Sequence, residues 1–146
     1  MPQYLVKPAN SVLVQGPHQI IEMKVGANAT AALMLPKRCV QYDAAAGDVK
    51  EAIVNTKVIG VIMEAPDQTF TTAYAVADPI RIVTKGIVMC DYVSGAVGCT
   101  PGDLLIPTAD GKVYIQTLCT DASLVIGKAL STVVAAGPDT VIVELY

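Results

Sequence analysis

Short runs of β-branched and aliphatic residues, separated by Gly, Pro and Asp, recur along most of this chain. Residues 58–63 form a continuous apolar run, which is typical of a strand that is covered on both faces. Residues 20–25 and 38–42 alternate between apolar and polar side chains, as half-buried strands do. We find no convincing helical period. Roughly nine to eleven strands of this kind predict a mainly β fold, a small β-barrel or sandwich-like domain.

Turn residues separate the strands of the second half. The clearest hairpin joins residues 103–107 to residues 112–116, because Asp110-Gly111 supplies the positive φ angles of a tight turn. Lys85-Gly86 indicates a hairpin or a bulge between two strands. Residues 47–55 contain good helix formers, but a strand is narrowly favoured there. The other strands expected in this half cover residues 79–84, 87–92, 124–130 and 140–145.

An internal similarity links the two halves of the chain. Residues 58–63 resemble residues 125–130, and upstream of each lie an apolar strand, a Gly-containing turn and a second strand. The pattern indicates two similar units in a pseudo-symmetric barrel. Chance similarity between short Val/Ile/Gly strings explains it equally well.

The N-terminal segment differs from the rest in its prolines, which favour extended conformations and disrupt interior ladders. We therefore divide the chain into residues 1–35, an extended N-terminal arm with peripheral strands, and residues 36–146, the β domain. The apolar residues of the arm are too few to form a core, so we expect them to contact a neighbouring subunit; an ordinary first strand is the alternative. The candidate contacts are Tyr4, Leu5, Val6, Val12, Leu13 and Val14.

The composition limits what the chain can bind. Hydrophobic residues make up 53% and charged residues only 16%, so we expect part of the surface to be buried against partners. The net charge is −3 and Lys37-Arg38 is the only adjacent basic pair, which argues against nucleic-acid binding. No apolar run is long enough to span a membrane, and no signal peptide is apparent, so we expect synthesis in a cytosol.

The sequence contains no arrangement of residues typical of catalysis or of metal binding. His18 is the only histidine and lies in a turn-like setting without a nearby Ser or Cys, so we expect a solvated turn residue. The aspartates lie in or beside predicted turns, where capping explains them. No phosphate-binding loop is present. We therefore predict no enzyme, no cofactor and no metal.

Four cysteines, at positions 39, 90, 99 and 119, lack the spacing of a zinc site. In a cytosol they are expected to be reduced and structural. A disulfide is the alternative, with Cys90 and Cys99 as the first pair to consider because they flank one predicted loop.

The order of strands and turns from about Leu35 to Tyr146 resembles that of the head decoration, or capsid cement, proteins of tailed bacteriophages. The similarity lies in residues 36–40, 58–61, 82–86, 102–105, 110–113, 126–130 and 141–145. It implies a small β-barrel-like domain, often trimeric, on the outer capsid surface. The implied partners are the major capsid protein and further copies of the chain, with no catalytic residues to transfer.

These considerations predict a structural protein of the virion that binds the expanded phage head and stabilises it against internal DNA pressure. The alternative is a β-barrel binding module for carbohydrate or a receptor, from a phage tail or surface protein. Aromatic residues make up only 5% and Trp is absent, which argues against stacking on sugar rings.

Overall fold

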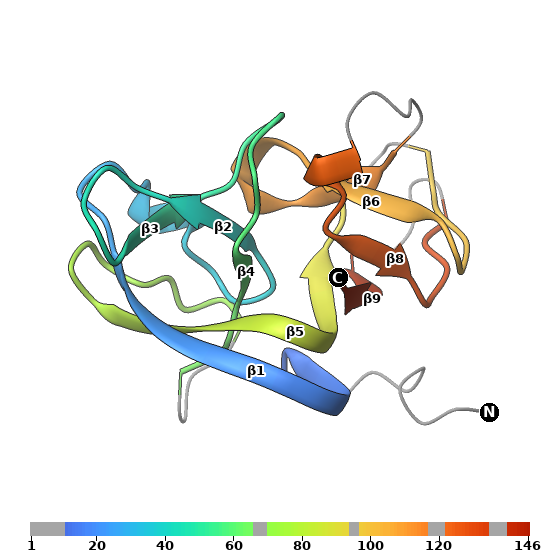
Figure 1. Cartoon of the computed structure of the whole chain (residues 1–146), viewed down its shortest axis with the longest axis horizontal. Coiled ribbons are helices and arrows are strands. Elements are labelled where there is room, and N and C mark those ends of the chain that lie inside the picture. Colours follow the sequence, from blue (N-terminus) through green and yellow to red (C-terminus); the bar gives the residue numbers. More distant parts are fainter. Residues whose placement is uncertain (1–10, 66–69, 94–96, 117–121, 135–139) are drawn as a thin grey trace.

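The computed structural model describes residues 11–65, 70–93, 97–116, 122–134 and 140–146. Within these ranges nine strands form one mixed sheet, three short 3-10 turns connect them, and no α-helix is present (Figure 1). The predicted mainly β fold is therefore confirmed.

The sheet has the strand order β1-β3-β2-β4-β5-β9-β8-β6-β7, with a further pairing between β1 and β5. The strands are β1 (Leu13–Val25), β2 (Cys39–Tyr42), β3 (Asp48–Glu51), β4 (Gly60–Ile62), β5 (Pro79–Asp91), β6 (Leu104–Pro107), β7 (Val113–Ile115), β8 (Gly127–Ala129) and β9 (Thr140–Leu145). The 3-10 turns are η2 (Ala31–Leu33), η3 (Ala109–Gly111) and η4 (Ala122–Leu124).

The predicted hairpin is confirmed, since β6 and β7 pair antiparallel around Asp110 and Gly111, whose φ angles are 63° and 73°. The narrowly favoured strand within residues 47–55 is β3. A hairpin at Lys85-Gly86 is wrong, because β5 runs unbroken from Pro79 to Asp91. The bulge alternative holds instead: β1 changes register opposite this point, between Gln15 and Gln19.

The segment before residue 35 contributes a long strand to the same sheet. β1 pairs antiparallel with β5 over most of its length and parallel with β3 at its end. Residues 1–10 lie outside the described residues. The division of the chain at residue 35 stays a prediction.

The strand pairings close on themselves twice, and β5 belongs to both circuits. β1 and the first part of β5 enclose β3, β2 and β4, and we call this circuit unit 1 (residues 20–84). The second part of β5 pairs with β9, followed by β8, β6 and β7, and a parallel bridge between Tyr92 and Val113 returns to the end of β5. We call this circuit unit 2 (residues 87–145). Figure 1 shows β2–β4 on the left and β6–β9 on the right, with β5 running below β2–β4 and turning upward between the two groups at its end.

The two units have the same strand registers. Val40 pairs with Gly60 in unit 1 as Leu105 pairs with Gly127 in unit 2. The same correspondence relates β3 to β7, the first part of β5 to β9, and β1 to the second part of β5. The similarity seen in the sequence thus reflects two units of one architecture.

The cores of the units correspond residue by residue. One buried cluster lies in unit 1, and each of its seven buried members has its register equivalent in the second cluster, which fills unit 2 and the contact between the units. The equivalent pairs are Val25/Tyr92, Met34/Cys99, Val40/Leu105, Val49/Val113, Ile62/Ala129, Ile80/Val141 and Ile82/Val143.

Candidate assembly surface

A cluster of charged side chains connects unit 1 to unit 2 through ion pairs. Lys37 and Arg38 lie in the turn before β2, and Asp91 ends β5. The Arg38 Nε atom donates to Asp91 Oδ2 at 2.6 Å, and Lys37 Nζ lies 3.3 Å from Asp91 Oδ1. These side chains are only 12–17% exposed, so the ion pairs are shielded from much of the solvent that weakens surface pairs.

The same two basic residues reach further elements of unit 2. Arg38 Nη1 donates to the backbone oxygen of Asp110 at 2.7 Å, and Lys37 Nζ lies 3.5 Å from Thr140 Oγ1. Lys37 Nζ also lies 4.8 Å from the centroid of the Phe70 ring, within the range of a cation–π contact. The turn before β2 therefore contacts one end of the β5–β9 pair, where Asp91 pairs with Thr140, and the β6–β7 turn.

Lys37 has a left-handed backbone conformation, with φ at 73°. The register equivalent is Gly102, with φ at 98°, and both residues follow a proline in a turn. Glycine adopts such angles without strain, whereas for another residue the left-handed conformation costs roughly 1–2 kcal/mol of folding free energy. The contacts of the Lys37 side chain with Asp91, Thr140 and Phe70 offset this cost. We therefore expect the Lys37 side chain to contribute to the stability of the contact between the units.

Two buried thiols lie next to this cluster, since Cys39 follows Arg38 and Cys90 precedes Asp91 in the chain. Cys39, Cys90 and Cys99 are free and buried, as the sequence predicts, and Cys119 lies outside the described residues. A hydrogen bond with Cys39, and then burial, raise the pKa of the Cys90 thiol well above its usual value. Burial raises the pKa of Cys99. Both thiols thus stay protonated at neutral pH, a state that is a poor nucleophile.

The structure places part of the candidate contact set inside the fold. Val12 is fully buried; its N–H donates to Glu64 Oε2 at 2.9 Å, and its carbonyl accepts from Met89 N at 2.8 Å. Leu13 packs partly buried against the core. Val14 is half-buried. Val12 therefore has no surface to offer a neighbour.

Tyr4, Leu5 and Val6 lie outside the described residues, and their role as contacts stays a prediction. Sequence reasoning missed the large apolar side chains that the described part of the chain exposes. They are Tyr42, Ile53, Val54, Val76, Val97, Leu104, Val134 and Tyr146. Most of them stand in runs that look like strands or loops of any β protein, so no signal in the sequence distinguishes them from core residues.

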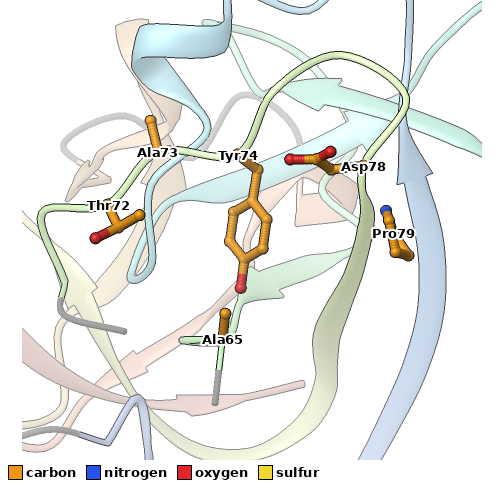
Figure 2. Close-up of a pocket in the computed structure, with 6 residues that line it drawn as sticks. All are labelled: Ala65, Thr72, Ala73, Tyr74, Asp78 and Pro79. Carbon is orange, nitrogen blue, oxygen red and sulfur yellow. The ribbon is translucent and has the colours of Figure 1, made fainter. Parts of the chain in front are cut away.

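A pocket of about 210 Å³ lies between the end of β4 and the start of β5. Figure 2 shows Tyr74 crossing it with the ring hydroxyl toward Ala65, and Asp78 and Pro79 at its side. The Tyr74 hydroxyl donates to the Met63 carbonyl at 2.8 Å, and the Asp78 carboxylate accepts from Ala75 N at 2.9 Å. Burial raises the pKa of Tyr74. These polar groups hold the loop in place.

His18 lies exposed on β1, with Nδ1 3.2 Å from the Gly16 carbonyl. In the described ranges no group of three or more His, Cys, Asp or Glu side chains could hold a metal ion. Among the same residues no helix is long and apolar enough to cross a membrane.

Comparison with known proteins bears on the fold. No protein-family model matches the chain, and no curated protein matches it. The fold is similar to that of a solved protein of a bacteriophage head. That structure is the head fiber gp8.5 N base of bacteriophage phi29, which is similar with a TM-score of 0.51 and 14% identity over 88% of this chain and 95% of that one. The likeness is one of fold.

Proposed function

We propose that this protein is a decoration protein of a tailed bacteriophage head, with a structural and non-enzymatic role. It binds the outer surface of the expanded shell and stabilises it against the pressure of packaged DNA. The observation that carries the proposal is the fold shared with the base of a head fiber, over 88% of this chain and 95% of that one. The low content of charged residues, 16%, and the exposed apolar side chains support it.

The mechanism is mass action. A protein that binds the expanded lattice, and not the separate subunits, adds its binding free energy to the cost of taking the lattice apart. At a free concentration one hundred times Kd, each occupied site contributes about 2.7 kcal/mol.

The partners in this proposal are the major capsid protein and two further copies of this chain. A homotrimer matches the threefold positions of a capsid lattice and buries sheet edges that would otherwise be exposed. The N-terminal residues, with Tyr4, Leu5 and Val6, extend the contact onto a neighbouring subunit.

Sedimentation with phage heads tests the proposal. Heads that lack the protein are prepared in the expanded and in the unexpanded form, and each is mixed with increasing amounts of the purified chain. We expect saturable co-sedimentation with expanded heads, weak binding to unexpanded ones, and slower loss of DNA from filled heads on warming. Equal binding to both forms, or none to either, contradicts the proposal.

A further inference from the structure

The contact between unit 1 and unit 2 serves as a template for a contact between two chains. In unit 1 the contact uses the turn at Lys37-Arg38 and the start of β2; in unit 2 it uses the end of β5 and the β6–β7 turn. Gly111 N donates to the Ala52 carbonyl at 2.9 Å, and a Cβ on Gly111 would lie 2.8 Å from the Cys39 carbonyl. The two surfaces therefore touch at backbone level.

Because the units correspond, each unit also carries the equivalent of the surface that the other unit uses in this contact. These two equivalent surfaces, which we call the unit 2 face and the unit 1 face, have no partner within the described part of the chain. The unit 2 face has Gly102, Asp103 and Leu104 where unit 1 has Lys37, Arg38 and Cys39. The unit 1 face has Lys24 and Gly47, which correspond to Asp91 and Gly111 in unit 2.

Both faces are open in the single chain. Cys39 is fully buried by the internal contact, whereas its equivalent Leu104 is 38% exposed. Gly111 is packed against the Cys39 carbonyl, whereas a Cβ on Gly47 would meet nothing within 4 Å. Leu104 on the unit 2 face and the turn at Gly47 on the unit 1 face are thus both uncovered in the single chain.

The charges on the two faces are complementary with the sign reversed. Inside the chain, Arg38 of unit 1 pairs with Asp91 of unit 2. The register equivalents are Asp103 on the unit 2 face and Lys24 on the unit 1 face. The Lys24 side chain is 56% exposed and has only a 3.6 Å pairing with Asp48, so its charge is accessible.

We infer that the chain binds a second copy of itself head to tail, with the unit 2 face of one copy on the unit 1 face of the next and Asp103 beside Lys24. The inference rests on the self-association in the proposed function and not on capsid binding. A head-to-tail contact of this kind forms a closed ring if its rotation closes, and three chains would then place their units around that ring.

This contact is weaker than its internal template. Val61 and Val83, which are fully buried in the template, are replaced on the unit 2 face by Lys128 and Glu144, an ion pair of 3.6 Å whose side chains are 41% and 46% exposed. Covering such a pair costs desolvation energy. We therefore expect reversible association that depends on protein concentration.

Charge reversal with sedimentation velocity tests the inference. Wild type should sediment as an oligomer that dissociates on dilution. Lys24→Glu and Asp103→Lys should each shift the population to the monomer, because each places like charges together. The double variant Lys24→Glu with Asp103→Lys should associate again. The inference is overturned if the single variants associate like wild type, or if the double variant stays monomeric.

Two further variants distinguish the loss of the contact between copies from a loss of folding. Lys57→Glu reverses an exposed charge in the loop between β3 and β4, on neither face, and should leave association unchanged. Leu104→Asp should abolish association and keep a cooperative melt, which covers the case in which Asp103→Lys disturbs the turn that Asp103 caps at Thr100. A wild type that is monomeric at every concentration overturns the inference, while its binding to expanded heads would leave the proposed function standing.

Discussion

At the scale of single residues, Lys37 has a strained backbone conformation whose cost is offset by the contacts of its side chain. Lys37→Gly relieves the positive φ of 73° but removes the contacts with Asp91, Thr140 and Phe70. We expect the free energy of unfolding to fall by about 1–3 kcal/mol, as for other partly buried charge contacts. Ala77→Gly is the matched control: Ala77 has the same φ of 73° in an exposed loop, so glycine should stabilise there. Denaturant unfolding measures both, and a stabilised Lys37→Gly variant would refute this account.

Asp43 should make a contribution to folding stability that is lost in acid. A hydrogen bond from the Asn28 side chain, and then one from its backbone N–H, lower the pKa of Asp43 below its ordinary value of 3.8. A lowered folded-state pKa stabilises the protein above the unfolded value, and this stabilisation is lost as the pH falls through the folded value. The difference in melting temperature between wild type and Asn28→Ala should therefore be constant near neutral pH and shrink below 3.8. A difference that persists in strong acid would show that the carboxylate is not its source.

At the scale of strands, two equivalent glycines allow close approach within each unit. A Cβ on Gly60 would lie 2.3 Å from the Val83 carbonyl oxygen, and one on Gly127 would lie 2.1 Å from that of Glu144. Alanine at either site must push neighbouring strands apart, so we expect the free energy of unfolding of each variant to fall by roughly 1–3 kcal/mol. Gly47→Ala is the control, because it meets no atom within 4 Å and suffers only its φ of +83°, about 1 kcal/mol. Equal losses in thermal unfolding at Gly47 and Gly60 would argue against the close contact.

The same scale shows what the sequence can predict. The β6–β7 hairpin was predictable because Asp110-Gly111 specifies its turn locally. Gly86 was not, because a Lys-Gly pair can end a strand or bulge within one, and the pairing of β1 along β5 decides between these. The cluster of Lys37, Arg38 and Asp91 was also hidden: Arg38 and Asp91 stand 53 positions apart, and only the contact between the units brings them together.

At the scale of the whole molecule, two similar units in one chain make the structure asymmetric at its ends. The internal contact is closed by Arg38 and Asp91, while each end keeps an open half that bears the opposite charge. If copies associate head to tail as we infer, each chain of two units would span a longer distance than a single unit would. Because exposed ion pairs are screened, association between copies should weaken with salt while the shielded internal cluster persists.

The last prediction concerns the N-terminal residues and the capsid. β1 begins at Leu13, and Val12 is held by Glu64 and Met89, so a deletion that reaches this point would damage the sheet. Removing only residues 2–10 takes away Tyr4, Leu5 and Val6 and leaves every described hydrogen bond in place. We expect the truncated chain to melt as cooperatively as wild type and to bind expanded heads at least tenfold more weakly, about 1.4 kcal/mol in binding free energy. Replacing the three apolar residues with serine in the full-length chain should weaken binding in the same way, because the contact is apolar. If both variants bind expanded heads like wild type, the N-terminal residues are not a capsid contact, and the exposed side chains of the sheet must supply it.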